Sequence, residues 1–196
     1  MAALLSDMAR LGIALSDADW VGLAPQFDVV QFAPDEVIDR QTEIAERWFF
    51  ITQGIAASRQ THLDGQISIA RFFEKGQVCA NLTSAWTQQY AADDLIALTE
   101  LAAVAIPDTL FRNEFIGGGE LGRYLRLKAM ETLCFDKEVL SAKSRVDTEI
   151  RYQFLERYHE AVLDRVRQRD IAAFLGITPQ GFSRFKRRRR TALNPS

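Results

Sequence analysis

The chain of 196 residues is 47% hydrophobic and 26% charged, with a net charge of −2, which excludes a disordered chain and supports one large or two small packed cores. It contains no run of 18 apolar residues and does not begin with a secretory signal, so we expect a cytoplasmic protein. Its two cysteines, Cys79 and Cys134, exclude a disulfide framework and a cysteine-rich metal site; both are expected to be buried free thiols.

The small net charge hides a strong asymmetry along the chain. Residues Arg165–Ser196 contain nine Lys or Arg and one acid, a net charge of +8. The preceding 164 residues contain fifteen bases and twenty-five acids, a net charge of −10. Such a split indicates a polyanionic partner for the carboxyl end, either nucleic acid or an anionic membrane surface.

The first half of the chain is predicted to be mainly β-structure. After a short amphipathic helix that starts with a capping box at Ser16–Asp19, short apolar stretches alternate with turn residues up to Pro107. Asp64 and Gly65 predict a hairpin with a two-residue type I′ turn, which requires positive φ at both residues. The predicted strands are Val29–Phe32, Trp48–Ile51, Ile55–Thr61, Gln66–Phe73, Leu95–Leu98 and Leu101–Ile106. Residues 1–107 are therefore expected to form one domain.

The pattern becomes helical after Pro107. Gly117–Gly119 predict a flexible joint, and an apolar stripe with helical spacing follows it. This stripe either packs on the chain's own β-domain or pairs with the same helix of a second subunit, and we favour pairing. The expected dimerisation residues are Leu121, Leu125, Ala129 and Leu133, with Met130 on the same stripe. Residues 108–145 are thus interpreted as a dimerisation helix and hinge.

Residues 146–196 are predicted to form a helix-turn-helix domain. A supporting helix follows Asp147 and carries its apolar side chains on one face: Ile150, Phe154, Leu155 and Tyr158. Arg169–Leu175 reads as the next short helix, which Gly176 ends because glycine readily adopts the left-handed conformation of a helix stop. Thr178 then caps a final helix with Pro179 in its first turn. Ala172, Ile177 and Phe182 are expected between the last two helices.

The outward face of the last helix suits duplex DNA. Arg184 can bond guanine O6 and N7, Gln180 can bond adenine N6 and N7, and Ser183 can bond a base or a phosphate. Thr178 at the helix start suits a phosphate, and Lys186 and Arg187–Arg190 add sequence-independent attraction. A basic helix end can also be a merely solvated face. The turn spacing, the Thr-Pro cap and the charge of this segment together favour DNA binding.

Asp170–Arg184 resembles the helix-turn-helix of the Crp/Fnr regulators. Phe32–Ile38 is similar to the opening of that family's cyclic-nucleotide-binding β-roll, and Phe49–Gly54 is similar to its following strand and glycine turn. The resemblance implies an α+β fold: an antiparallel, jelly-roll-like β-roll sensor domain, a long dimerisation helix and a C-terminal helix-turn-helix domain. It also implies a homodimer that binds double-stranded DNA at promoters. RNA polymerase and an unidentified small-molecule effector are further candidate partners, and no membrane partner is expected.

The sequence departs from the family where a cyclic nucleotide would bind. Members that bind one use a Gly-Glu pair and an Arg followed by a small hydroxyl residue. Here Ala80 and Asn81 replace the Gly-Glu pair, and no Arg or Lys lies between Trp86 and Leu98, where Asp93 and Asp94 stand instead. Two carboxylates beside a phosphate are unfavourable, so cyclic AMP is not expected to be the ligand.

Other functions find less support in the sequence. An iron–sulfur sensor needs four cysteines, and haem would have to use His62 or His159 as its axial ligand, so no cofactor is assigned. No catalytic motif is present, and we expect no enzyme activity. Two alternatives remain open: a module whose basic end binds RNA or an acidic protein, and a regulator whose sensor domain is vestigial and ligand-independent.

Overall fold

The structure is a computed structural model that describes residues 1–193, so the last three residues of the basic segment lie outside it. Two helices, α1 (Ala2–Arg10) and α2 (Asp17–Leu23), and the short 3-10 helix η1 (Ala24–Gln26) precede the first strand. The Ser16 hydroxyl oxygen accepts a hydrogen bond from the Asp19 backbone N–H at 3.1 Å, which confirms the predicted start of α2. Helix α1, which buries Leu4 and Met8, was not predicted from the sequence.

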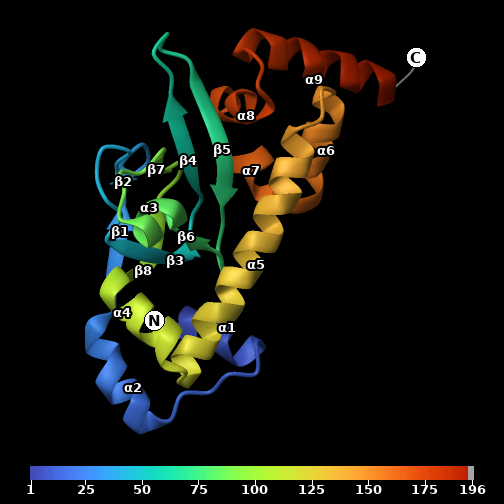
Figure 1. Cartoon of the computed structure of the whole chain (residues 1–196). Coiled ribbons are helices and arrows are strands. Elements are labelled where there is room, and N and C mark those ends of the chain that lie inside the picture. The colour runs from blue at the N-terminus through green and yellow to red at the C-terminus, as the bar shows by residue number, and fades with distance from the viewer. Residues whose placement is uncertain (194–196) are drawn as a thin grey trace.

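The predicted antiparallel β-roll is confirmed (Figure 1). Its strands form two four-stranded sheets, with the orders β1-β8-β3-β6 and β2-β7-β4-β5. The short helix α3 (Leu82–Thr87), absent from the sequence analysis, lies between β6 and β7. The strands are β1 (Asp28–Phe32), β2 (Val37–Asp39), β3 (Arg47–Gln53), β4 (Ala56–Thr61), β5 (Ile67–Phe73), β6 (Val78–Cys79), β7 (Asp94–Ala97) and β8 (Leu101–Pro107).

The two sheets enclose an apolar core and are joined by tight turns. Phe49, Ile51, Leu95 and Ala103 are among its buried side chains. The turn between β3 and β4 requires glycine, because Gly54 has φ of +90° and a Cβ there would collide with the backbone at Glu100. The Phe49–Gly54 segment therefore has a structural reason for its final glycine.

The hairpin between β4 and β5 forms where it was predicted, but its turn type differs. His62 and Gln66 close the loop through a hydrogen bond from the His62 N–H to the Gln66 carbonyl at 2.8 Å. Gly65 has φ of +79°, whereas Asp64 is not among the residues with positive φ. The predicted two-residue type I′ turn is thus wrong. A three-residue loop, Leu63–Gly65, places only its glycine in the left-handed region.

Six helices follow the roll among the described residues: α4 (Asp108–Gly117), α5 (Glu120–Lys143), α6 (Thr148–Tyr158), α7 (Glu160–Arg165), α8 (Gln168–Leu175) and α9 (Pro179–Leu193). The predicted glycine joint is a sharp break between α4 and α5, with Gly118 at φ of +90°. In Figure 1, α5 runs from α4 and α1 along the roll to α6, and α8 and α9 lie at the end of the molecule reached by the β4–β5 hairpin.

The amino-terminal half of α5 is fastened to the roll and to α1 by buried side chains. Leu121 and Leu125 are each 1% exposed and belong to the chain's own core, so the expectation that they contact a second subunit is wrong. Ala129 is half-buried. The stripe read from the sequence combines residues of unequal burial. Leu121 and Leu125 lie in the chain's own core, whereas Leu133 is 58% exposed and lines a cavity between α5 and the roll.

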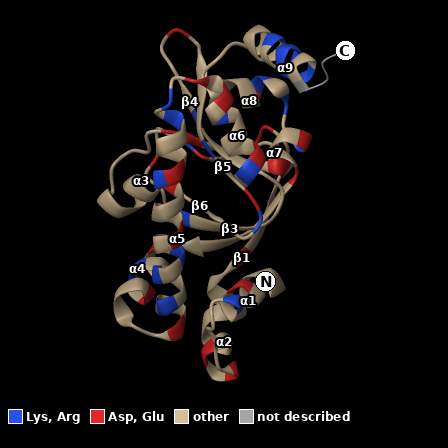
Figure 2. Cartoon of the chain, turned by 90° about the vertical axis from the view of Figure 1, so that its right-hand side faces the viewer, with Lys and Arg blue, Asp and Glu red and all other residues tan. Residues whose placement is uncertain are grey.

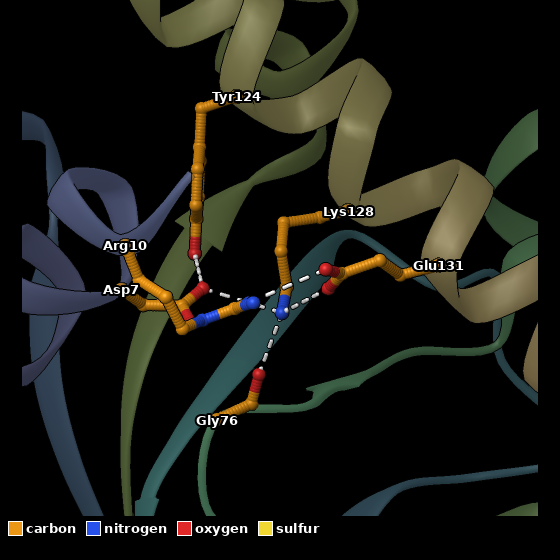
Figure 3. A network of polar contacts seen from close by, with 6 residues as sticks. All are labelled: Asp7, Arg10, Gly76, Tyr124, Lys128 and Glu131. Carbon is orange, nitrogen blue, oxygen red and sulfur yellow. Dashed lines mark hydrogen bonds and ion pairs between the residues drawn. The ribbon is translucent and has the colours of Figure 1, made fainter. Parts of the chain in front are cut away.

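A polar network completes this attachment (Figure 3). Lys128 is 5% exposed. Its ammonium donates to the Gly76 carbonyl at 2.7 Å and pairs with Asp7 at 3.2 Å and with Glu131 at 2.9 Å. The Tyr124 hydroxyl donates to the same Asp7 carboxylate at 2.8 Å. Burial raises the pKa of Asp7, but the Tyr124 hydrogen bond and the Lys128 charge together lower it below its usual value.

The carboxyl-terminal half of α5 leaves an apolar stripe uncovered. Met130 is 59% exposed and Leu140 is 70% exposed, with Leu133 between them. Cys134, beside this stripe, is exposed, so the expectation of two buried thiols holds for Cys79 alone. We call the three exposed residues Met130, Leu133 and Leu140 the α5 stripe.

Candidate nucleic-acid interface

Two helices joined by a tight turn, α8 and α9, occupy the segment predicted to form the helix-turn-helix. The chain ends α8 at Gly176, whose φ of +67° is the left-handed conformation expected there. The Ile177 N–H donates to the Ala172 carbonyl at 3.0 Å, which closes the turn. The Thr178 hydroxyl oxygen accepts a hydrogen bond from the Gly181 N–H at 3.0 Å and so caps α9.

Gly181 fits this cap although glycine is a poor helix former. A Cβ at this position would lie 3.2 Å from the Thr178 hydroxyl oxygen and 3.7 Å from the Ile177 Cβ. A larger residue would therefore crowd the capping hydroxyl. The glycine keeps the turn tight at the cost of some helix stability.

An aromatic core holds α9 at a fixed angle to α8 and α6. Phe182 is 1% exposed, and the Tyr152 ring lies 5.2 Å from the ring of Phe185. Ala172 is fully buried, and Ile177 is half-buried against the same cluster, as the sequence predicted. These contacts bury one face of α9 and leave the other free.

The side chains predicted to bind DNA are exposed on α9 and at its start. Gln180, Ser183, Arg184 and Arg187 recur at helical spacing on the side opposite Phe182 and Phe185. Thr178 and Lys186 are also exposed, with the Lys186 ammonium 5.6 Å from the Phe182 ring centre. None of the cations on this face pairs with an acid within residues 1–193. Figure 2 shows the resulting basic segments along α9.

One arginine of the basic run does not face outward. The Arg189 guanidinium makes two hydrogen bonds to Glu156, at 2.5 and 2.8 Å, and one to Glu149 at 2.8 Å. It also lies 4.7 Å from the Tyr152 ring centre. Arg189 therefore clamps α9 to α6, contrary to the expectation that all of Arg187–Arg190 attract DNA. Its spacing from Phe182 and Phe185 puts it on the buried face and could have revealed this role.

A second candidate site is the cavity of about 580 Å³ between the roll, α3 and α5. Its charged groups pair internally: Arg71 bonds Asp136, and the Ser58 hydroxyl donates to Asp93 at 2.5 Å. The Lys143 ammonium donates to the Ile69 carbonyl at 2.6 Å. We call this the roll pocket.

The lining of the roll pocket carries as many carboxylates as cations. Two cations, Arg71 and Lys143, stand against the carboxylates of Asp93 and Asp136, so the lining offers no excess positive charge to a phosphate. The Asn81 amide donates to Asp39 at 3.0 Å and to the Asp93 carbonyl at 3.2 Å, so it is already bonded within the roll. Burial raises the pKa of Asp39 more than this hydrogen bond lowers it.

The two histidines considered as haem ligands differ in exposure and in their surroundings. His62 is exposed, with its Nε2 2.9 Å from the Ser68 hydroxyl. His159 is fully buried where α6 meets α7, with its Nδ1 3.6 Å from a Glu74 carboxylate oxygen and with aromatic rings around it. The structure brings neither histidine to the roll pocket.

Comparisons with known proteins agree with this architecture. Residues 29–116 match the family model described as cyclic nucleotide-binding domain, and no curated protein matches the sequence. The solved structure of FixK2 from Bradyrhizobium japonicum is 17% identical, with a TM-score of 0.66 over 85% of each chain. CLP, a c-di-GMP responsive global regulator from Xanthomonas campestris, is 12% identical, with a TM-score of 0.64 over 90% of this chain and 93% of that chain.

A further structure is described as a transcriptional regulator of the Crp/Fnr family from Eubacterium rectale. It is 12% identical, with a TM-score of 0.67 over 91% of this chain and 85% of that chain. Within residues 1–193, no helix has both the length and the apolar character needed to cross a membrane. Residues 29–116 are therefore similar to a cyclic nucleotide-binding domain, and the chain shares its fold with these solved structures.

Proposed function

We propose that the chain is a sequence-specific DNA-binding transcription regulator of Crp/Fnr type that acts as a homodimer at promoters. The observation that carries this proposal is the outward face of α9. Gln180, Ser183 and Arg184 are exposed there on a helix fixed by its other face. In a helix-turn-helix the second helix enters the major groove and presents such side chains to base edges.

Charge supports double-stranded DNA as the partner. Arg184 and Arg187 are exposed and unpaired within the described part of the chain, so their guanidinium groups keep their donors for bases and phosphates. Thr178 lies at the start of α9, where backbone N–H groups favour a phosphate. Recognition by base edges gives sequence preference, and phosphate contacts give affinity.

The α5 stripe supports a homodimer. Met130, Leu133 and Leu140 follow one another at helical intervals and together leave large apolar side chains in solvent. A symmetric pair of α5 helices would cover both copies of the stripe and place two α9 helices on one DNA duplex. Leu133→Glu should therefore turn a dimer into a monomer in analytical ultracentrifugation, whereas Glu138→Gln on the same helix should not. An unchanged mass for Leu133→Glu would contradict this interface.

The internal pairing of the roll pocket favours a sensor that needs no nucleotide. Arg71 and Asp136 already join β5 to α5, so the roll and the helix are connected through the chain's own side chains. Titration calorimetry with cyclic nucleotides and small metabolites should give no saturable heat. A saturable heat with any of them would instead identify an effector.

The regulator itself is tested by selecting bound sites from random duplexes and measuring affinities by fluorescence anisotropy. Arg184→Ala should weaken binding to the selected site by roughly 1–3 kcal/mol and relax the preference at one base pair. Arg165→Ala, at the end of α7, removes the same charge outside α9 and serves as the matched control.

Two outcomes would contradict the proposal. An equal loss for Arg184→Ala on selected and scrambled duplexes would remove the base-reading role of α9. Competition by single-stranded RNA as effective as that by duplex DNA would favour the module that binds RNA.

A further inference from the structure

The first helix of the helix-turn-helix is tied to the roll by a carboxylate distant in sequence. The Arg167 guanidinium donates two hydrogen bonds to Asp35, one at 2.7 Å to Oδ2 and a shorter one to Oδ1. Arg169 reaches the same carboxylate at 3.6 Å. The two arginines stand at the amino end of α8, and Asp35 lies in the turn between β1 and β2, 132 residues before Arg167.

The turn that carries Asp35 is built to hold this carboxylate in place. Asp35 has φ of +70°, a left-handed conformation that side chains other than Asn and Asp rarely adopt. Its N–H donates to the Ala97 carbonyl at 2.8 Å, and the Glu36 carboxylate accepts a hydrogen bond from the Ala33 N–H. The hydrogen bonds from Arg167 lower the pKa of Asp35 below its usual value.

Apolar packing keeps α8 beside this turn. Ile69 and Phe72 of β5 share one buried cluster with Ile171 and Phe174 of α8, and the rings of Phe72 and Phe174 are 5.2 Å apart. The position of α8 on the roll therefore does not depend on the ion pairs alone. The carboxylate can exchange its partner while the helix stays docked.

A DNA phosphate would compete for the same guanidinium groups. The first helix of a helix-turn-helix crosses the DNA backbone, and the amino end of a helix favours anions. Arg167 and Arg169 are 42% and 60% exposed, so both can be reached from solvent. A guanidinium bonds a carboxylate and a phosphate through the same two-pronged arrangement of donors.

We propose that Asp35 is an intramolecular substitute for a DNA phosphate, which holds Arg167 and Arg169 in the free protein and must release them when DNA binds. The roll thus restrains DNA binding through one carboxylate. This inference rests on the proposed DNA-binding function and adds a site that opposes it. Asp170, 6% exposed, pairs with both arginines from within α8 and keeps them oriented during the exchange.

The test compares Asp35→Asn with Asp164→Asn in the full-length protein. Asn tolerates the left-handed backbone, and Asp164 is an exposed acid near Arg167 with no ion pair within residues 1–193. Both changes add the same charge. Asp35→Asn should tighten binding to duplex DNA by about two- to fivefold, the size expected for an exposed ion pair, and Asp164→Asn should not match that gain.

A second pair of variants makes the outcome specific. In an Arg167→Gln, Arg169→Gln background, binding should be weaker, and adding Asp35→Asn should bring no gain, because nothing remains for the carboxylate to hold. Equal affinities for Asp35→Asn and Asp164→Asn would overturn the proposal. Weaker binding of Asp35→Asn to duplex DNA would also overturn the proposal, because Asp35 would then support DNA binding by positioning α8 and would not oppose it. Absence of duplex binding by the unchanged protein would instead contradict the proposed function itself.

Discussion

The outward face of α9 and the roll pocket use their charged side chains in opposite ways. On α9, Arg184 and Arg187 are exposed and pair with no acid in the described residues. In the roll pocket, Arg71 bonds Asp136 and Ser58 bonds Asp93, so polar groups that a ligand could use are bonded to one another.

The charged groups on α9 are thus free to bind an external partner, whereas those in the roll pocket already bind other groups of the same chain. An unpaired guanidinium on a surface keeps its hydration and costs little until a phosphate replaces the water. A buried charge must be paired because an unpaired one is strongly unfavourable. The same residue types therefore indicate binding on α9 and structural integrity in the roll.

The largest effect is expected from removing a buried charge near the roll. Lys128→Met leaves Asp7 and the Gly76 carbonyl without their ammonium partner, and breaking such a buried pair should lower the free energy of unfolding by about 3–5 kcal/mol. Urea unfolding followed by circular dichroism measures the loss. Lys75→Met, an exposed lysine next to Gly76, is the control and should change stability little. Equal stabilities for both variants would show that the network of Figure 3 contributes nothing.

Local features of the helix-turn-helix could be predicted from the sequence, and the roll pocket could not. Gly176 and Thr178 act on neighbours within a few residues, so their roles follow from spacing alone. The Arg71–Asp136 bond joins residues 65 positions apart, and only the folded chain decides that they meet. The pattern along the chain identifies elements, while pairing between elements depends on their packing.

Helix α5 shows the same limit. Leu121 and Leu133 belong to one apolar stripe in the sequence, yet the roll covers the first and leaves the second exposed. The helical pattern of the sequence does not show which residues of a broad apolar stripe pack against the chain's own roll. How closely each turn of the helix packs against the roll and α1 decides that, and this packing is a property of the tertiary structure.

A smaller effect is expected when Arg187 and Arg189 of α9 are replaced, and the two replacements should change different properties. Arg187→Ala should reduce the slope of log affinity against log salt by about 0.9, the value for one lost phosphate contact on duplex DNA. Arg189→Ala should leave that slope unchanged and instead lower stability by up to about 1 kcal/mol, because its guanidinium bonds Glu149 and Glu156. Anisotropy titrations across a range of KCl concentrations, with urea unfolding of both variants, make the comparison. A reduced slope for Arg189→Ala would mean that the clamp opens on DNA.

The smallest effect concerns Asp39 of the roll, which pairs with no cation in the part of the chain that the structure describes. Burial raises the pKa of Asp39, so the unfolded chain ionises this group at a lower pH than the folded chain does. Below the ordinary aspartate pKa of about 3.9, Asp39 is protonated in both states and does not affect the free energy of unfolding. As pH rises from there to the raised pKa of the folded state, ionisation of Asp39 increasingly lowers that free energy. Above that value the penalty is constant.

Asp39→Asn should remove this penalty and keep an oxygen that can accept the hydrogen bond from Asn81. The variant should therefore equal the unchanged protein in thermal stability near pH 3.5 and exceed it slightly at pH 7. Asp164→Asn, at an exposed position of α7 with no ion pair within residues 1–193, gives the baseline for loss of one carboxylate. A variant less stable than the unchanged protein at pH 7 would mean that ionised Asp39 stabilises the roll, and the account of the roll as a region of internally compensated charge would have to include an unidentified cation beside it.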